Sequence, residues 1–517
     1  MVRLLFTICI ISSLVVNLSG QTATGNNGQF RIRGFHLDLR IQPMKMSALR
    51  EFARELHEKG INTLIMEWEA TFPFASHPMI PNKYAYSKAA IDSFILFCGQ
   101  LGIDVIPLQQ SFGHVEYILR NYRYKELRED QENYSQVCPM KAELDRQLFT
   151  QLFVEMAASH PSKYFHIGGD ETYLLGHCPL CKAKADKVGK SRLYIDYIRM
   201  LCEIVIGMGK QPVLWADIAL KYPDAIEELP KGTIFVDWNY GWDMNRFGDH
   251  QNLVSSGYEI WGACSMRSHP DNYFLTVWPK HFQNISDFLP AARISGYSGM
   301  IMTSWSTSGQ YSTLSESETD IFELYAIRHV YPIIGFDILL AAYAEGLNNP
   351  APLNTNKFIL EYATAKFGFD NKQANQFEHA LMLAPYQVSQ GFVLSPKEMS
   401  MDELLDSAKT ALRILQNMKA LKNQSAYQQF IVMQEIRLQY LSYEQIEIIT
   451  NGPTFNNKNI PEILKRLELL LKKSKKINQE FENLNQGWYY PAVLREENDL
   501  RNQKLTQLYV RLARNVY

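Results

Sequence analysis

The sequence predicts an α/β fold, a (β/α)8 TIM barrel followed by an α-helical C-terminal domain. Three observations support this. Eight short apolar runs alternate with longer amphipathic stretches between Arg31 and about Pro332. The runs are almost continuously apolar, as strands buried on both faces are. Their carboxyl ends repeatedly carry polar or aromatic residues, and in a barrel these ends converge on one mouth. An open, doubly wound sheet is the alternative, because counting strands does not show closure.

The eight expected strands are spaced evenly enough for a helix to follow most of them. They are residues 35–39, 63–69, 104–110, 164–171, 212–217, 233–240, 259–265 and 299–305. Stretches of helical periodicity at 47–59, 88–101, 142–159 and 192–208 are long enough to cross back over a sheet. Residues at the strand ends that could line the mouth are Glu69, Gln110, Asp170, Glu171, Trp215, Asp217, Trp238, Tyr240 and Trp305.

The last third of the chain has a different pattern. Residues 348–356 are rich in Asn and Pro, and they precede strand-poor sequence with helical periodicity at 401–420, 428–450 and 461–484. We therefore expect a catalytic barrel at 31–345 and a helical accessory domain at 350–517.

The first 21 residues have the pattern of a secretory signal peptide. A positive start at Arg3 is followed by an apolar run from Leu4 to Val16 and then by small and polar residues. This run is short for a membrane span, and no later stretch is long and uncharged enough for one. We expect an exported protein, periplasmic or extracellular, that does not insert into a membrane.

Composition excludes several classes of function. Lys and Arg number 52 against 54 Asp and Glu, a formal net charge of −2, so the chain lacks the basic character of a nucleic-acid-binding protein. Its 46% apolar and 21% charged residues exclude wholesale disorder. Aromatic residues, at 12%, permit a sugar-binding site without showing one. The oligomeric state stays open, with a homodimer as one alternative.

The cysteines leave two alternatives. Cys178 and Cys181 form a CxxC pair that could be half of a zinc site, with Cys138 as a distant third ligand. The other interpretation, for an exported protein, is a disulfide or free thiols. We favour this interpretation and therefore expect no metal ligands.

The segment Tyr164–Glu171 carries the strongest chemical signal. An apolar strand runs into two glycines and then into the adjacent carboxylates of Asp170 and Glu171. The glycines allow the backbone to leave β geometry, so that both acids could enter one pocket. Neighbouring carboxylates raise each other's proton affinity, which keeps one available as a general acid. The alternative is that the pair caps the following helix.

These residues are similar to a known family. His-Ile-Gly-Gly-Asp-Glu at 166–171 resembles the signature of family 20 glycoside hydrolases, the β-N-acetylhexosaminidases. Segments that resemble the hexosaminidase D-like branch of this family occur in the same order at 33–38, 83–87, 105–116 and 213–217. The resemblance covers roughly residues 31 to 310 and does not extend to the helical third.

The resemblance implies an exo-acting β-N-acetylhexosaminidase that removes terminal, non-reducing β-linked N-acetylglucosamine or N-acetylgalactosamine. It implies a retaining, substrate-assisted mechanism without a cofactor. Glu171 would be the general acid/base, and the substrate's acetamido oxygen would attack the anomeric carbon to form an oxazolinium ion. Asp170 would orient the acetamido group. The alternative is a non-catalytic carbohydrate-binding protein on the same barrel.

The resemblance also implies substrate-binding residues. Arg33 matches the arginine that binds sugar hydroxyls, His114 matches a pocket histidine, and Glu69 would bind a hydroxyl or pair with Arg33. The aromatic walls would come from Trp215, Trp238 and Trp305, with Asp217 beside them. The tyrosine that many members carry after the seventh strand is missing from 261–265, and we expect Tyr240 to replace it.

Overall fold

The computed structural model describes residues 30–40, 43–268, 275–305, 332–383, 386–389, 392–395 and 398–514. The predicted signal peptide lies outside these residues. No helix in the described ranges combines the length and the apolar character that crossing a membrane requires.

Eight parallel strands form a closed barrel in which each strand pairs with the next along the chain and β1 pairs with β8. The strands are β1 (Ile32–Asp38), β2 (Thr63–Glu67), β3 (Asp104–Leu108), β4 (Tyr164–His166), β5 (Gln211–Trp215), β6 (Ile234–Trp238), β7 (Glu259–Arg267) and β8 (Gly299–Ser304). All eight overlap the predicted strands, and the closure excludes the open doubly wound sheet.

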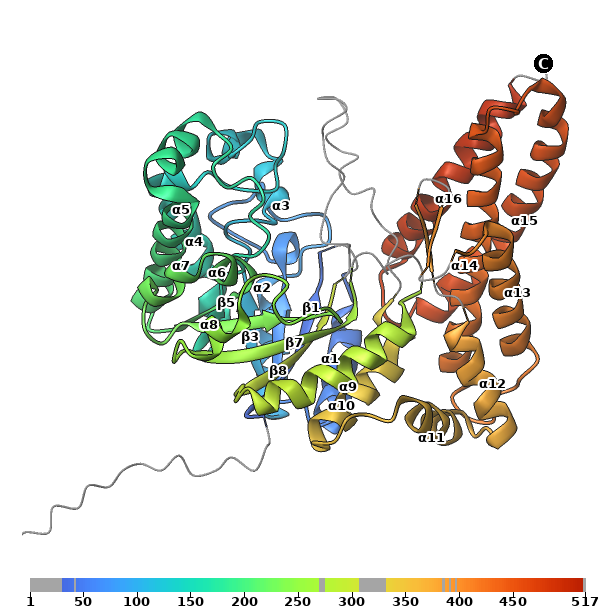
Figure 1. The fold of residues 1–517 in the computed structure, drawn as a ribbon, viewed down its shortest axis with the longest axis horizontal. Helices are drawn as coiled ribbons and strands as arrows, with labels where there is room; N and C mark the ends of the chain where they lie inside the picture. Colours follow the sequence, from blue (N-terminus) through green and yellow to red (C-terminus); the bar gives the residue numbers. More distant parts are fainter. Residues whose placement is uncertain are drawn as a thin grey trace, which may run out of the picture.

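Helices surround the barrel between and after the strands (Figure 1). They are α1 (Met46–Glu58), α2 (Lys88–Gln100), α3 (Glu116–Leu119), α4 (Ala142–Ser159), α5 (Pro179–Gly207), α6 (Asp217–Lys221), α7 (Pro223–Glu228), α8 (His250–Val254), α9 (Trp278–Ile294) and α10 (Asp337–Asn348). Short 3-10 helices are η1 (Glu69–Thr71), η2 (Tyr122–Leu127), η3 (Pro139–Lys141) and η5 (Ile333–Phe336).

The C-terminal third is helical, as predicted, and Figure 1 shows α12–α16 gathered in an elongated bundle coloured orange to red. Its elements are α11 (Thr355–Phe367), α12 (Asn371–Met382), α13 (Met401–Gln416), α14 (Gln424–Asn451), η6 (Asn457–Asn459), α15 (Ile460–Asn485) and α16 (Pro491–Ala513), with a short antiparallel pair of β9 (Gln387–Ser389) and β10 (Phe392–Leu394).

The barrel has an inner and an outer layer of apolar side chains, set by the two-residue period of each strand. On β1, Ile32 belongs to the inner cluster, whereas Phe35 and Leu37 pack outward with the helices. The Phe35 ring lies 5.2 Å from that of Phe52 on α1. This alternation decides which polar side chains can reach the mouth.

The outer apolar layer continues from the barrel into the helical third. Trp278 on α9 lies 6.0 Å, ring to ring, from Phe430 on α14. Close to the carboxyl end of β1, the Lys45 amide donates to the carbonyl oxygen of Trp488 at 2.7 Å, and Met44 forms an antiparallel bridge with Tyr489. The helices are thus packed against the barrel by one continuous cluster of buried side chains.

Candidate active site

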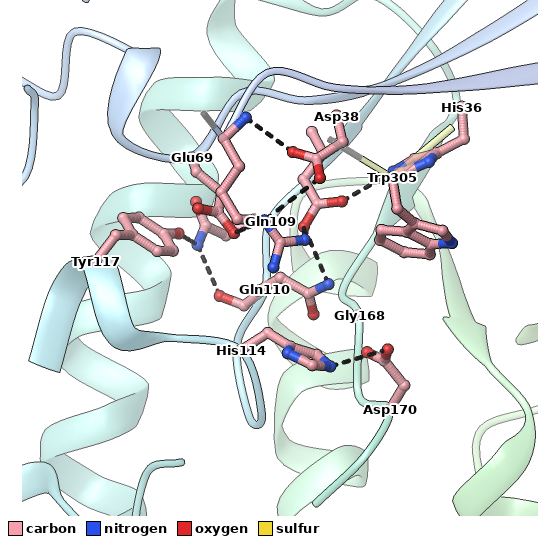
Figure 2. A network of polar contacts seen from close by, with 12 residues as sticks. His36, Asp38, Glu69, Gln109, Gln110, His114, Tyr117, Gly168, Asp170 and Trp305 are labelled. Atoms are coloured by element: carbon pink, nitrogen blue, oxygen red, sulfur yellow. Dashed lines mark hydrogen bonds and ion pairs between the residues drawn. The ribbon is translucent and has the colours of Figure 1, made fainter. Parts of the chain in front are cut away.

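The carboxyl ends of the strands bring polar and aromatic side chains from distant parts of the sequence to one mouth. Figure 2 shows His36 and Asp38 from β1, Gln110 after β3, Asp170 after β4 and Trp305 after β8 around a common space. This is the end of a barrel at which binding and catalysis are built.

Two glycines bring the loops after β3 and β4 close together. A side chain at Gly168, which has φ of 72°, would place its Cβ 2.0 Å from Gln110 Oε1. A Cβ at Gly113 would lie 2.6 Å from the carbonyl oxygen of Asp170. Only glycine fits at these two positions, so the contact between the two loops depends on the local sequence.

Backbone strain is concentrated at this mouth. Within the described ranges, four residues other than glycine have positive φ, and three of them are Glu69 (44°), His114 (57°) and Glu171 (47°). Such conformations cost of order 1–3 kcal/mol each and persist where the surrounding structure holds them, often at functional sites. The strain therefore supports a functional role for the three residues predicted here.

Asp170 and Glu171 both contact His114. His114 Nε2 lies 3.3 Å from Asp170 Oδ2 and 3.3 Å from Glu171 Oε2. Burial by itself lowers the pKa of an imidazole, but the charges and hydrogen bonds of the two acids raise the pKa of His114 well above its usual range. The two acids thus favour the protonated form of the histidine.

The two acids differ in exposure. The side chain of Asp170 is 8% exposed and that of Glu171 is 27% exposed. Asp170 Oδ1 is buried and has no hydrogen-bond partner among the described residues. The next helix, α5, begins only at Pro179, with Cys178 as its N-cap. The capping alternative for Asp170 and Glu171 is therefore wrong.

Further contacts fix Glu171 in place. Its amide donates to Asp217 Oδ2 at 3.1 Å, and its Oε1 accepts from the Tyr173 hydroxyl at 2.8 Å. Asp217 Oδ1 accepts from Trp238 Nε1 at 3.3 Å. Burial and the neighbouring charge of Asp170 raise the pKa of Asp217 to about 8. Asp217 thus links the acid pair to the aromatic wall.

Four aromatic side chains predicted for the site lie together. Trp215 is buried, with its ring 5.8 Å from that of Trp305, and its Nε1 has no hydrogen-bond partner among the described residues. Trp305 Nε1 donates to the Tyr240 hydroxyl at 2.9 Å, and the Tyr240 and Trp238 rings are 5.1 Å apart. These residues form an aromatic wall beside the acid pair.

The structure corrects the prediction for Arg33. Its guanidinium donates to Asn348 Oδ1 at 2.7 Å and lies beside Gly60, which precedes β2 at the amino-terminal end of the barrel. Arg33 is the second residue of β1 and is one residue out of phase with the inward-facing Ile32. Strand alternation therefore turns this arginine outward and away from the mouth.

Arg40, which the sequence analysis did not select, occupies the mouth instead. This buried arginine follows β1 and lies 3.0 Å from Glu67 Oε1, 3.2 Å from Glu69 Oε1 and 3.5 Å from Asp38 Oδ2. Glu69 thus pairs with Arg40 and not with Arg33.

Three buried carboxyl groups lie around the Arg40 guanidinium, and the pKa values of two of them are shifted in opposite directions. Burial by itself raises the pKa of Glu67, but Arg40 and the adjacent His36 lower it to about 2. For Glu69, burial and the charges of Glu67 and Asp38 outweigh Arg40 and raise the pKa well above its usual range. The environment therefore favours the ionised form of Glu67 and raises the proton affinity of Glu69.

The two arginines provide a matched test of this correction. Arg40→Gln leaves buried carboxylates without their cation, so we expect the free energy of unfolding to fall by about 3–5 kcal/mol. Arg33→Gln removes a hydrogen bond to Asn348, and we expect a fall of about 0.5–1.5 kcal/mol. Urea denaturation of both variants measures the difference. Equal losses would contradict the assignment of Arg40 to the buried network.

Several site residues escaped sequence reasoning. They are His36, Asp38, Arg40, Glu67 and Tyr173. The two-residue period of a strand predicts part of this set, because His36, Asp38 and Arg40 lie an even number of residues after the inward-facing Ile32. Tyr173 lies in a loop and gives no periodic signal.

The chain is similar to known proteins over most of the barrel. The family model described as "Glycosyl hydrolase family 20, catalytic domain" matches residues 40–311, just over half of the chain. Hexosaminidase D of Bos taurus is 26% identical over 302 residues, which cover 55% of this chain and 87% of the relative. Hexosaminidase D of Homo sapiens is 28% identical over 305 residues, which cover 56% of this chain and 62% of the relative.

Among solved structures, the β-N-acetylhexosaminidase from Bacteroides fragilis NCTC 9343 matches with a TM-score of 0.48 and 18% identity, over 65% of this chain and 70% of that one. The family match covers β2 to β8 of the barrel and includes Arg40, His114, Asp170, Glu171 and Trp305. The chain therefore belongs to glycosyl hydrolase family 20 and is a glycoside hydrolase.

Proposed function

We propose that the enzyme is an exo-acting β-N-acetylhexosaminidase that removes terminal, non-reducing β-linked N-acetylglucosamine or N-acetylgalactosamine from glycans. The observation that carries this proposal is the difference in burial between the two acids of the pair. Asp170 presents a buried oxygen without a partner among the described residues, and Glu171 beside it is partly exposed. A buried acceptor of this kind suits the N–H of an acetamido group, and a more exposed carboxyl group suits proton exchange with a leaving group and water.

The proposed reaction proceeds with retention and with help from the substrate. Glu171 protonates the glycosidic oxygen while the acetamido oxygen attacks the anomeric carbon, which forms an oxazolinium ion and releases the leaving group. Asp170 accepts a hydrogen bond from the acetamido N–H and balances the developing positive charge. Glu171 then removes a proton from water, which attacks the anomeric carbon and reopens the ring.

The surrounding residues have proposed roles in binding. Trp215, Trp305 and Tyr240 would enclose the acetamido group, and the Tyr240 hydroxyl would position its oxygen in place of the missing family tyrosine. Trp238 would stack on the sugar. Glu69 and the Arg40 guanidinium, on the β1 and β2 side of the mouth, would bind sugar hydroxyls.

A chromogenic assay tests this function. The purified protein should release the aryl group from aryl N-acetyl-β-glucosaminide, from the β-galactosaminide epimer, or from both. Binding of N-acetylhexosamine without any release would favour the non-catalytic sugar-binding alternative. A doubly substituted Asp170→Asn, Glu171→Gln protein is the control for contaminating activity.

We further propose that the enzyme acts after export, periplasmically or extracellularly, on the basis of the pattern in residues 1–21. Sequencing the amino terminus of protein purified from its natural source tests this: a start near residue 22 is expected, and a retained apolar run would contradict export by cleavage.

A further inference from the structure

A second cluster of reactive side chains lies outside the candidate active site. Glu129, Cys138, Cys178 and Cys181 bring one carboxylate oxygen and three sulfurs within 4.8 Å of one another. Glu129 and Cys138 belong to the long segment between β3 and α4, and the other two cysteines are at the start of α5. We propose that these four side chains bind one structural Zn²⁺ ion, which holds the loop after β3 against the loop after β4.

The sulfur positions suit metal ligands. Cys138 Sγ lies 3.6 Å from Cys178 Sγ and 3.5 Å from Cys181 Sγ. A tetrahedral ion with Zn–S bonds of about 2.3 Å separates its sulfur ligands by about 3.8 Å. A disulfide requires a sulfur–sulfur distance of about 2.05 Å. The three sulfurs are thus spaced around a common point, and Cys138 contacts both of the others.

Glu129 is oriented to complete the site. Its Oε1 accepts from the amides of His177 at 2.7 Å and Cys178 at 2.8 Å, which leaves Oε2 on the side of the sulfurs, 3.1 Å from Cys181 Sγ. Hydrogen bonds that fix a ligand from behind are the usual support of a metal site.

The start of α5 supports the same conclusion. Cys178 is the N-cap of the helix, and its sulfur accepts from the Cys181 amide at 3.3 Å. This turn aims both sulfurs of the CxxC pair in one direction. None of the hydrogen bonds or ion pairs that the four side chains make in the described part of the chain involves Lys or Arg. A bound cation would therefore balance the buried carboxylate and the thiolates that form when the metal binds.

Four protein ligands make a closed site, which is typical of structural zinc. The ion would tie together the segment that carries His114 and the loop that carries Asp170 and Glu171. Direct contacts already join the same segments, including His114 with Asp170 and Glu171 and the Leu174 amide donating to Gln136 Oε1 at 3.0 Å, and the ion would add to them. The metal would therefore position the catalytic loops without contacting substrate.

Metal analysis of the full-length wild-type protein tests the proposal directly. Protein prepared without chelators and without a metal-binding tag should contain about one zinc ion per chain. Replacement of zinc by Co²⁺ should give sulfur-to-cobalt charge-transfer bands and the visible spectrum of tetrahedral cobalt. Both measurements are independent of glycosidase activity.

Matched variants assign the ligands. We expect Cys138→Ser and Glu129→Gln to weaken zinc binding at least about tenfold, as loss of a supporting group already does. Two control variants should keep zinc at the wild-type level. Cys98→Ala changes a buried cysteine on α2, and Glu132→Gln changes an exposed acid in the segment that carries Glu129. Loss of zinc in the control variants alone would overturn the ligand assignment.

The wild-type measurement also decides the proposal if a variant fails to fold. Protein that binds no zinc after equilibration with Zn²⁺ would overturn it. So would a disulfide between any two of the three cysteines, detected by mass spectrometry of non-reduced peptides from protein isolated from its natural source.

Discussion

Replacing Glu171 with Gln is expected to lower kcat/KM by about 10²–10⁴-fold for glycosides with poor leaving groups, because the variant cannot donate the proton that the departing oxygen needs. The loss of kcat/KM should be much smaller for activated aryl glycosides, because their aryl group leaves without protonation. Rates on one activated and one unactivated substrate measure this dependence on the leaving group.

Asp170→Asn should behave differently. The variant keeps the size of the side chain but loses the charge that orients the acetamido group and stabilises the oxazolinium ion. Its loss should persist with a good leaving group, because intramolecular attack itself is impaired. Glu227→Gln, at an exposed acid on α7, is the control and should match wild type. If both active-site variants show the same dependence on the leaving group, the proposed division of roles is wrong.

The second large effect concerns the substrate. A β-glucoside with a 2-hydroxyl in place of the 2-acetamido group carries no nucleophile, and we expect no detectable turnover. Well-positioned intramolecular groups act at effective molarities of about 10⁵–10⁸ M, so the missing group is not replaced by water at a comparable rate.

A thiazoline analogue of the cyclised intermediate should, for the same reason, bind more tightly than substrate, because it resembles the species that the site stabilises. Paired assays of aryl β-glucoside and aryl N-acetyl-β-glucosaminide, with the thiazoline as competitor, test both expectations. Turnover of the two glycosides at comparable kcat would rule out substrate assistance.

The barrel could be predicted from the sequence because each strand is buried on both faces and is therefore a short, nearly continuous apolar run. Asp170 and Glu171 were selected as the candidate catalytic pair for a similar reason, since two glycines and two acids at the end of such a run have few structural explanations. Arg33 shows the limit of motif matching. The strand's alternation turns it outward, and the same alternation turns Arg40 inward.

Contacts between distant segments were not accessible in this way. Cys138 is 40 residues from Cys178, and the sequence suggested it only as a distant third ligand. Glu129 was not suggested, because a single glutamate in a polar loop resembles any solvated acid until the fold places it against three sulfurs. The helix α16 was also missed, since its polar residues weaken the periodic signal.

The continuous packing between barrel and helices has a consequence for how sequence changes act. Trp278 and the residues around Lys45 bury surface against α14 and the segment before α16, so unfolding of the helices would expose apolar surface of the barrel as well. The free energy of unfolding is then a property of the whole chain, shared by the catalytic and non-catalytic parts. A substitution deep in the helical third, far from any sugar, can change how many molecules are folded at a given moment, and hence the amount of working enzyme, while every folded molecule keeps its full rate.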